Sequence, residues 1–154
     1  MSGARGPPGA EVVKRILVAL DGSPRAPTVI AAAARLAELS NGKLVLFRAI
    51  SIPVDMPQEV LSVMDRRLED VLIGNAHAEL ERHAAGLPRG RVERIMTPFA
   101  TAWDGICHAA RELDVDLIVI GSHGYGAIDR VIGTTAAKVV NHADRNVLVV
   151  RTLL

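Results

Sequence analysis

The sequence predicts an α/β domain built on an all-parallel β-sheet. Five short apolar runs alternate with four helical segments, the order expected when right-handed helical crossovers join parallel strands. The first run is continuously apolar rather than alternating, and continuous hydrophobicity is typical of strands that are covered on both faces. A length of 154 residues suits one domain with one hydrophobic core.

The first predicted elements follow a Gly/Pro-rich segment. Residues 1–13 are expected to form a flexible tail because they are rich in glycine and proline, and they lack the apolar stretch of a signal peptide. Residues 14–154 are expected to form the single domain. Residues 15–20 predict the first strand. Ser23 then predicts a helix N-cap, followed by Pro24 as the first helical residue, and Asn41-Gly42 predicts the end of this helix after residue 40.

The remaining elements are predicted from the same patterns. Helices show apolar residues spaced by threes and fours, while strands are short apolar runs. In chain order they are a strand at 43–50, a proline-containing loop at 51–58, a helix at 59–85, a more polar strand at 91–96 that suits a sheet edge, a helix at 100–113, a strand at 116–120, a short helix at 136–141 and a strand at 146–151.

Composition and charge exclude several classes of function. The net charge is +1 and the basic residues are scattered, so neither nucleic acid nor an acidic membrane surface is predicted as a partner. No segment approaches the ~20 apolar residues needed to span a bilayer. Cys107 is the only cysteine, which excludes an intrachain disulfide and a cysteine metal cluster. A single cysteine favours a reducing, cytoplasmic location.

The most informative motif begins where the fourth predicted strand ends, at Gly121-Ser122-His123-Gly124. Eight residues, 125–132, separate it from Gly133-Thr134-Thr135 at the next helix. Glycine lets backbone N–H groups approach an anion, and the amides at a helix N-terminus favour negative charge. The motif therefore predicts a phosphate-binding turn. The threonine hydroxyls can serve either as helix caps or as phosphate donors.

Asp21 is a second candidate, because it directly follows the first predicted strand. Ligands of parallel sheets bind beyond the carboxyl ends of strands, where the winding direction reverses. If the first and fourth strands are neighbours, Asp21 and the glycine motif meet at that point. Asp21 can cap the first helix, contact a ligand, or do both.

Taken together, these motifs resemble the universal stress protein family over residues 14–151. The resemblance rests on the following segments: Ile16-Leu17-Val18-Ala19-Leu20-Asp21-Gly22-Ser23, Asp116-Leu117-Ile118-Val119-Ile120-Gly121-Ser122-His123-Gly124, Gly133-Thr134-Thr135-Ala136-Ala137-Lys138-Val139-Val140, His142-Ala143 and Val147-Leu148-Val149-Val150-Arg151. It implies a Rossmann-like, five-stranded parallel sheet in the order 3-2-1-4-5, with helices on both faces.

The resemblance also implies an adenine-nucleotide site for ATP, or for AMP or ADP. The implied contacts are the backbone of Ala19, the carboxylate of Asp21 and the backbone of Ala49 with base and ribose, Ile120 and Gly121 beside the ribose, and Gly124, Gly133, Thr134 and Thr135 with the phosphates. His123 is a further phosphate-contact candidate. ATP-binding members have nine residues in the interval where this chain has eight. The shorter interval favours an alternative, a nucleotide-free member that acts as an interaction or chaperone-like dimer.

No catalytic arrangement accompanies this predicted site. The sequence has no Gly-Lys-Ser/Thr P-loop, no Ser-His-Asp spacing and no second acidic residue beside Asp21 for a catalytic metal. Any Mg²⁺ would be held through the phosphates only, and hydrolysis would be very slow. We therefore expect a cytoplasmic stress-response or energy-sensing module that binds ATP and is not an enzyme.

The last predicted strand suggests a further partner. In the order 3-2-1-4-5 it lies at a sheet edge, and an open apolar edge favours pairing with a second copy about a twofold axis. Members of the family that the chain resembles dimerise through this strand. We therefore expect a homodimer through Val147–Val150, with an unknown protein as downstream partner.

Overall fold

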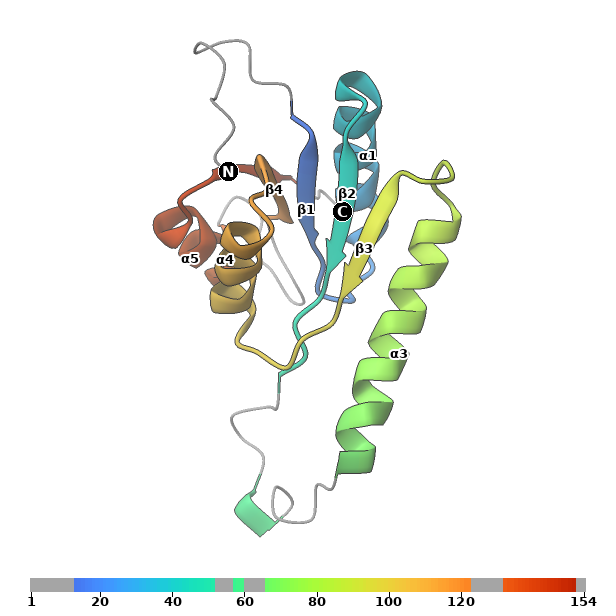
Figure 1. The fold of residues 1–154 in the computed structure, drawn as a ribbon. Coiled ribbons are helices and arrows are strands. Elements are labelled where there is room, and N and C mark those ends of the chain that lie inside the picture. Colours follow the sequence, from blue (N-terminus) through green and yellow to red (C-terminus); the bar gives the residue numbers. More distant parts are fainter. Residues whose placement is uncertain (1–12, 52–56, 60–65, 123–131, 152–154) are drawn as a thin grey trace.

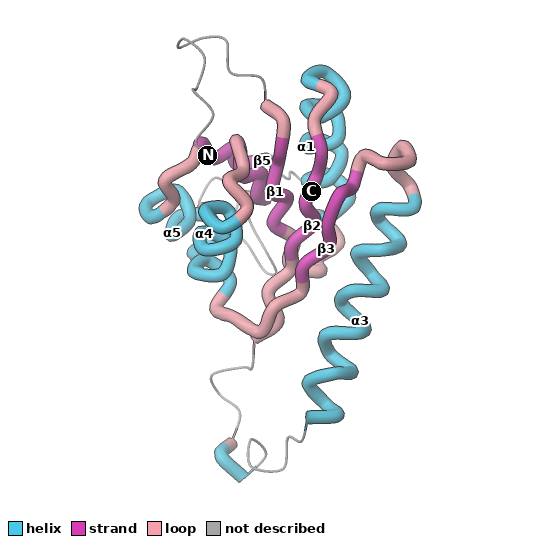
Figure 2. Tube along the Cα trace, in the orientation of Figure 1, coloured by secondary structure: helices cyan, strands magenta, loops and turns pink. Residues whose placement is uncertain are grey.

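The chain folds into a five-stranded parallel sheet with helices on both faces (Figure 1, Figure 2). The computed structural model describes residues 13–51, 57–59, 66–122 and 132–151. In chain order the elements are β1 (Arg15–Ala19), α1 (Ala26–Ser40), β2 (Lys43–Phe47), α3 (Arg66–Ala85), β3 (Val92–Met96), α4 (Ala102–Glu112), β4 (Leu117–Gly121), α5 (Thr134–His142) and β5 (Asn146–Val150). The strand order is β3-β2-β1-β4-β5, which confirms the predicted fold.

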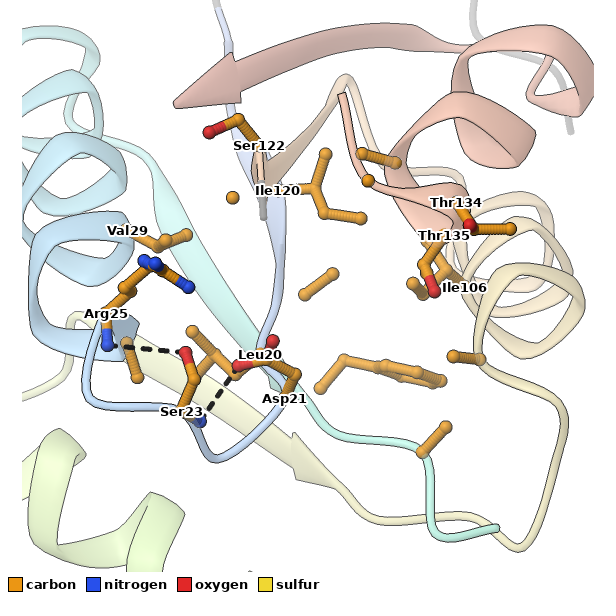
Figure 3. Close-up of a pocket in the computed structure, with 18 of the residues that line it drawn as sticks. Leu20, Asp21, Ser23, Arg25, Val29, Ile106, Ile120, Ser122, Thr134 and Thr135 are labelled. Carbon is orange, nitrogen blue, oxygen red and sulfur yellow. Dashed lines mark hydrogen bonds between the residues drawn. The ribbon is translucent and has the colours of Figure 1, made fainter. Parts of the chain in front are cut away.

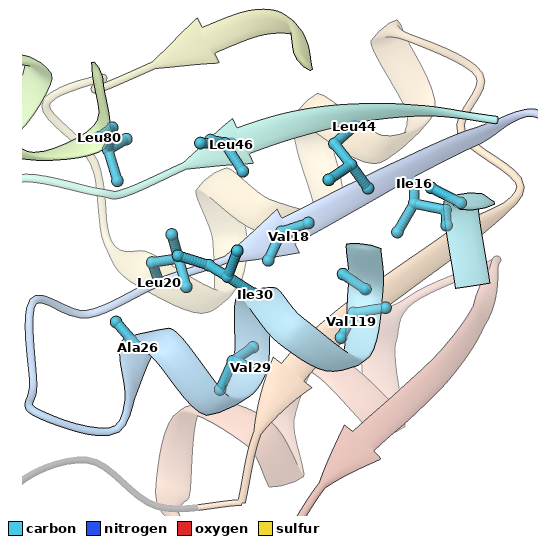
Figure 4. Packing of buried hydrophobic residues seen from close by; sticks show 12 residues of the cluster. Ile16, Val18, Leu20, Ala26, Val29, Ile30, Leu44, Leu46, Leu80 and Val119 are labelled. Carbon is cyan, nitrogen blue, oxygen red and sulfur yellow. The ribbon is translucent and has the colours of Figure 1, made fainter. Parts of the chain in front are cut away.

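Side chains of the central strands alternate between two hydrophobic cores. From β1, Ile16 and Val18 pack in a cluster with α1 and α3 (Figure 4), whereas Leu17 and Ala19 pack in a cluster with α4 and α5. Both faces of the strand are therefore buried, which explains why its sequence is continuously apolar. On α4, burial raises the pKa of the Cys107 thiol, so this residue packs as a small protonated side chain.

The start of α1 differs from the prediction. Arg25, not Ser23, occupies the N-cap position, and the helix begins at Ala26. Ser23 belongs instead to the turn after β1, where its N–H donates to Asp21 and its Oγ accepts a hydrogen bond from the N–H of Arg25. The predicted N-cap was wrong because Ser23 makes these local hydrogen bonds before the helix starts.

The start of α5 also differs from the prediction, because the helix begins at Thr134 rather than at residue 136. Gly133 is the N-cap and no side-chain hydrogen bond caps the helix. Thr134 and Thr135 are therefore its first two residues, and the interpretation of their hydroxyls as N-caps is wrong.

Other boundaries shift where the chain leaves the sheet. The second strand ends at Phe47, three residues before its predicted end at 50, although Ile50 still forms an isolated bridge with Phe99. The long predicted helix at 59–85 is described from Arg66 onward as α3, and residues 60–65 lie outside the described residues. β3 and β5 are the two sheet edges, as predicted.

Candidate functional site

A cavity with a volume of about 310 Å³ lies at the carboxyl ends of β1 and β4 (Figure 3). These strands are neighbours at the centre of the sheet, and the helices that follow them, α1 and α5, pack on opposite faces. The cavity therefore occupies the point where the winding direction reverses, where parallel sheets bind ligands. Its volume is at the lower end of the range for small-molecule sites.

Most of the predicted site residues meet at this cavity. Those that line it are Ala19, Asp21, Ala49, Ile120, Gly121, Gly133, Thr134 and Thr135. The other two, His123 and Gly124, lie outside the described residues, as does most of the eight-residue interval before Gly133. The cavity thus joins four segments that are far apart in the sequence.

A chain of local hydrogen bonds orients Asp21 at one side of the cavity. Asp21 Oδ1 accepts a hydrogen bond from the N–H of Ser23 at 2.9 Å, and Ser23 Oγ accepts one from the N–H of Arg25 at 3.3 Å (Figure 3). Gly22 has a φ of 75°, which glycine adopts at little cost. The turn therefore presents the Asp21 carboxylate without help from a ligand.

The opposite wall is the N-terminus of α5. The N–H of Gly133 donates to the carbonyl of Ser122 at 2.6 Å, and the first helical bond runs from the N–H of Ala137 to the carbonyl of Gly133 at 2.9 Å. Within the described parts of the chain, no acceptor is found for the N–H groups of residues 134–136. The positive end of the helix dipole adds to these donors. This wall can therefore bind an anion.

The end of β2 offers a backbone donor and acceptor. The N–H groups of Arg48 and Ile50 donate to the carbonyls of Met96 and Pro98, on the β3 side. Successive peptide groups of an extended strand point to opposite sides. The N–H and C=O of Ala49 are therefore directed away from β3, to the side where β1 has ended and the cavity begins.

Sequence reasoning missed several residues of the cavity wall. They are Leu20, Ser23, Arg25, Ala26, Val29, Phe47, Ser51, Ala102, Ile106, Ser122 and Ala136. Most are small or apolar, and nothing in the local sequence distinguishes them from ordinary core residues. Arg25 had a usable signal, since a cation in the first turn after a switch-point strand lies near any ligand there.

The charge of the described cavity wall is carried by two side chains. Asp21 and Arg25 are the acidic and basic residues among the described residues that line the cavity. In the described part of the chain, no group of three or more His, Cys, Asp or Glu side chains is placed to hold a metal ion. A membrane-spanning helix is likewise absent from the described residues, since none is both long and apolar enough.

Comparisons with known proteins match nearly the whole chain. The model of the Universal stress protein family matches residues 13–151. Universal stress protein A homolog 1 from Coxiella burnetii is 31% identical over 140 residues, which cover 89% of this chain and 95% of that protein. The family match spans the β1 turn, the glycine motif and β5.

Two solved structures show the same fold at lower identity. The universal stress protein UspA from Lactobacillus plantarum superposes with a TM-score of 0.73 at 24% identity, covering 92% of this chain and 99% of that one. A universal stress protein in complex with cAMP superposes with a TM-score of 0.61 at 24% identity, covering 93% and 100%. At such identities the likeness concerns the fold.

Proposed function

This chain belongs to the universal stress protein family, and we propose that it binds an adenine nucleotide in the cavity between β1 and β4. One observation carries the proposal: residues that the family resemblance assigns to nucleotide binding come from four separate segments and line a single cavity. The complex of a structurally similar protein with cAMP supports the same class of ligand.

The base is expected to bind at the end of β2. The N–H and C=O of Ala49 are directed toward the cavity and form a donor–acceptor pair that matches the Watson–Crick edge of adenine. Ala19 lies on the neighbouring strand, and the apolar side chains of Val29 and Ile106 also line the cavity. This arrangement favours a flat, partly apolar ring with polar groups along one edge.

The ribose is expected to lie beside Asp21. One carboxylate oxygen, Oδ1, accepts the hydrogen bond from Ser23, which leaves Oδ2 to accept hydrogen bonds from ribose hydroxyls. Ile120 and Gly121 border the same part of the cavity. Hydrogen bonds to an ionised carboxylate are among the stronger ones, so Asp21 would contribute both affinity and selectivity for the sugar.

The phosphates are expected to bind at the N-terminus of α5. The amides of residues 134–136 and the hydroxyls of Thr134 and Thr135 supply donors, and Arg25 supplies a positive charge from the other side of the cavity. We propose ATP as the ligand, with ADP and AMP as alternatives that differ in how many phosphates this wall holds. Mg²⁺ would be held through the phosphates.

The proposed role is that of a binding module in the stress response or in energy sensing, not of an enzyme. Asp21 is the one carboxylate among the described lining residues, and its Oδ1 is already used by Ser23. Such an arrangement supplies no positioned general base for an attacking water, so hydrolysis would be very slow. We propose a cytoplasmic location, where adenine nucleotides are abundant and Cys107 stays reduced.

Isothermal titration of the purified protein with ATP, ADP and AMP tests the proposal, with GTP as control. We expect binding of at least one adenine nucleotide and much weaker binding of GTP, because guanine reverses the donor and acceptor that Ala49 would meet. Mass spectrometry of the denatured protein adds a second readout, since a co-purified nucleotide reveals its phosphate number. Absence of adenine-nucleotide binding would refute the proposal.

The eight-residue interval favours a second candidate, a nucleotide-free interaction or chaperone-like dimer. In that case the glycines would serve only the turn and the packing of α5. The same titration separates the two candidates, because the second predicts no heat of binding and no co-purified nucleotide.

We also propose a homodimer through β5. This strand is an edge of the sheet, and Leu148 on it is 38% exposed. Pairing of two β5 edges would satisfy the edge hydrogen bonds and cover this side chain. Sedimentation velocity at micromolar concentration should give a dimer for the wild type and a monomer for Leu148→Lys. A monomeric wild type would contradict the proposal.

A further inference from the structure

We propose that Arg48 and Glu79 form a positioning pair. Arg48, held by Glu79, packs against the turn formed by Asp21, Gly22 and Ser23, and the pair thereby strengthens nucleotide binding. Neither residue lines the described cavity wall, and neither was singled out by the sequence motifs. The inference rests on the proposed function, because it concerns how the same site is held in shape.

Arg48 lies against the turn that carries Asp21. It follows directly after β2, and its N–H donates to the carbonyl of Met96 at 2.9 Å, which anchors its backbone to β3. A Cβ built on Gly22 would lie 2.6 Å from Cζ, 2.6 Å from Nη2 and 2.8 Å from Nη1 of Arg48. Since these distances are nearly equal, the flat face of the guanidinium, not its edge, covers Gly22.

Glu79 of α3 holds the guanidinium in this orientation. Its Oε2 accepts a hydrogen bond from Nη1 of Arg48 at 2.5 Å, while the two side chains are 25% and 31% exposed. An ion pair that is largely shielded from water is screened less by salt than a surface pair. The guanidinium is planar, so one edge can bind the carboxylate while one face packs on the glycine.

The pair therefore supports a turn of unusual conformation. Gly22 has a φ of 75°, and the residues on either side of it form the Asp21–Ser23 hydrogen bond that orients the carboxylate. Arg48 fills the space that a side chain at position 22 would occupy. Without Glu79 the Arg48 guanidinium can rotate away from Gly22. The turn that orients Asp21 then loses its packing contact with this guanidinium.

Hydrogen exchange of the Ser23 amide tests this support without any ligand. That N–H donates to Asp21, so its protection from exchange reports how often the turn opens. We expect Glu79→Gln to lower its protection about fivefold. The matched control is Glu81→Gln on the same helix, whose side chain is 61% exposed and pairs with His77, and it should leave Ser23 unchanged. Equal protection in wild type and Glu79→Gln would overturn the inference.

A double-mutant cycle tests the effect on affinity. By titration, Glu79→Gln should weaken ATP binding about threefold to tenfold, and Arg48→Lys should do the same because an ammonium has no flat face. Because Glu79 acts through Asp21, its effect should largely vanish in the Asp21→Asn background. A merely structural role predicts the same loss in both backgrounds and would overturn the inference.

The two measurements separate this inference from the proposed function. A wild type that binds no adenine nucleotide refutes the proposed function and the affinity effect, while exchange at Ser23 still decides whether the pair holds the turn. A wild type that binds ATP as tightly as Glu79→Gln leaves the proposed function intact and overturns the positioning role.

Discussion

The two helices that begin at the cavity, α1 and α5, differ in how their first N–H groups are satisfied. At α1 the N–H of Ala26 donates to the carbonyl of Ser23 at 3.1 Å, Pro27 has no N–H, and the N–H of Thr28 donates to the carbonyl of Arg25 at 3.1 Å. The first N–H groups of α1 are thus satisfied by carbonyl groups of the same chain. What this helix start presents to a ligand is therefore the Asp21 and Arg25 side chains rather than backbone N–H groups.

At α5 the first backbone N–H groups have no such acceptors among the described residues. Gly133 as N-cap has no side chain to accept from them, and within the described residues the N–H groups of residues 134–136 find no acceptor. Helix starts usually satisfy such groups by caps or water. The two sides of the cavity thus contribute different groups. The side at the start of α1, which we call the α1 wall, contributes the side-chain charges of Asp21 and Arg25 on a preformed turn. The side at the start of α5, the α5 wall, contributes backbone N–H donors for an anion.

The largest effect is expected when the N–H groups at the start of α5 are given an acceptor within the protein. Gly133→Asp should place a carboxylate at the N-cap, where it accepts from the open amides and repels a phosphate. We expect ATP binding by titration to weaken about 100-fold, because like-charge contacts cost several kcal/mol. The melting temperature should stay equal or rise slightly, since aspartate caps helices a little better than glycine. Gly133→Ser is the neutral control, with a smaller loss of affinity.

On the α1 wall, Asp21→Asn should weaken ATP binding about tenfold to 100-fold, the usual contribution of a hydrogen bond to a charged group. Asparagine keeps an oxygen that can accept from Ser23, so the turn should survive. The wild type should prefer ATP over 2′-deoxy-ATP, and the variant should lose most of this preference. Equal affinities of both proteins for ATP would place the ribose away from Asp21.

Gly22→Ala tests whether the α1 wall is preformed. An L side chain with positive φ costs about 1–2 kcal/mol of unfolding free energy. Overpacking against the Arg48 guanidinium should add about 1 kcal/mol or more. Gly90→Ala is the matched control, since Gly90 has a φ of 80° but its Cβ would lie 3.9 Å from the nearest atom, Nζ of Lys43. Urea unfolding should show the larger loss for Gly22→Ala, and equal losses would contradict the contact with Arg48.

Arg25→Gln should have the smallest effect. Arg25 as a whole residue is half-buried, and charges near the protein surface contribute modestly and are screened by salt. We expect ATP affinity to fall about threefold at low ionic strength and less at high ionic strength. Arg35→Gln, on the exposed side of α1, is the control and should leave the ATP affinity unchanged at both low and high ionic strength. An unchanged affinity for Arg25→Gln at low ionic strength would show that the α1 wall adds no charge to phosphate binding.

Much of this molecule could be predicted without its structure. Apolar runs such as Leu17–Ala19 and Ile118–Ile120 predict buried parallel strands because backbone pairing and burial act within a few residues. The glycines and Asp21 stand directly after such strands, so their place at the carboxyl edge of the sheet followed from the strand assignments. Local patterns therefore predicted the α/β class and pointed to Asp21, Gly121, Gly133, Thr134 and Thr135, all of which line the cavity. The strand order and the other lining candidates, Ala19, Ala49 and Ile120, were implied by the resemblance to the universal stress protein family.

The errors arose where one residue had two possible partners. Ser23 could cap α1 or hydrogen-bond to Asp21, and the structure has the second arrangement. Thr134 and Thr135 could cap α5 or enter it, and they enter it because Gly133 takes the cap position. Sequence patterns state what each side chain is able to do, but the choice depends on small differences in backbone direction.

By itself the sequence determined the order of strands and helices, the continuous hydrophobicity of the buried strands and the polar residues at their ends. Only the tertiary structure decided that Phe47, Val29 and Ile106 line one cavity, and that Glu79 reaches Arg48 beneath Gly22. The physical reason is range. Hydrogen bonding and hydrophobic periodicity leave a signal within one turn or strand, whereas a contact between α3 and the β1 turn depends on how whole elements pack.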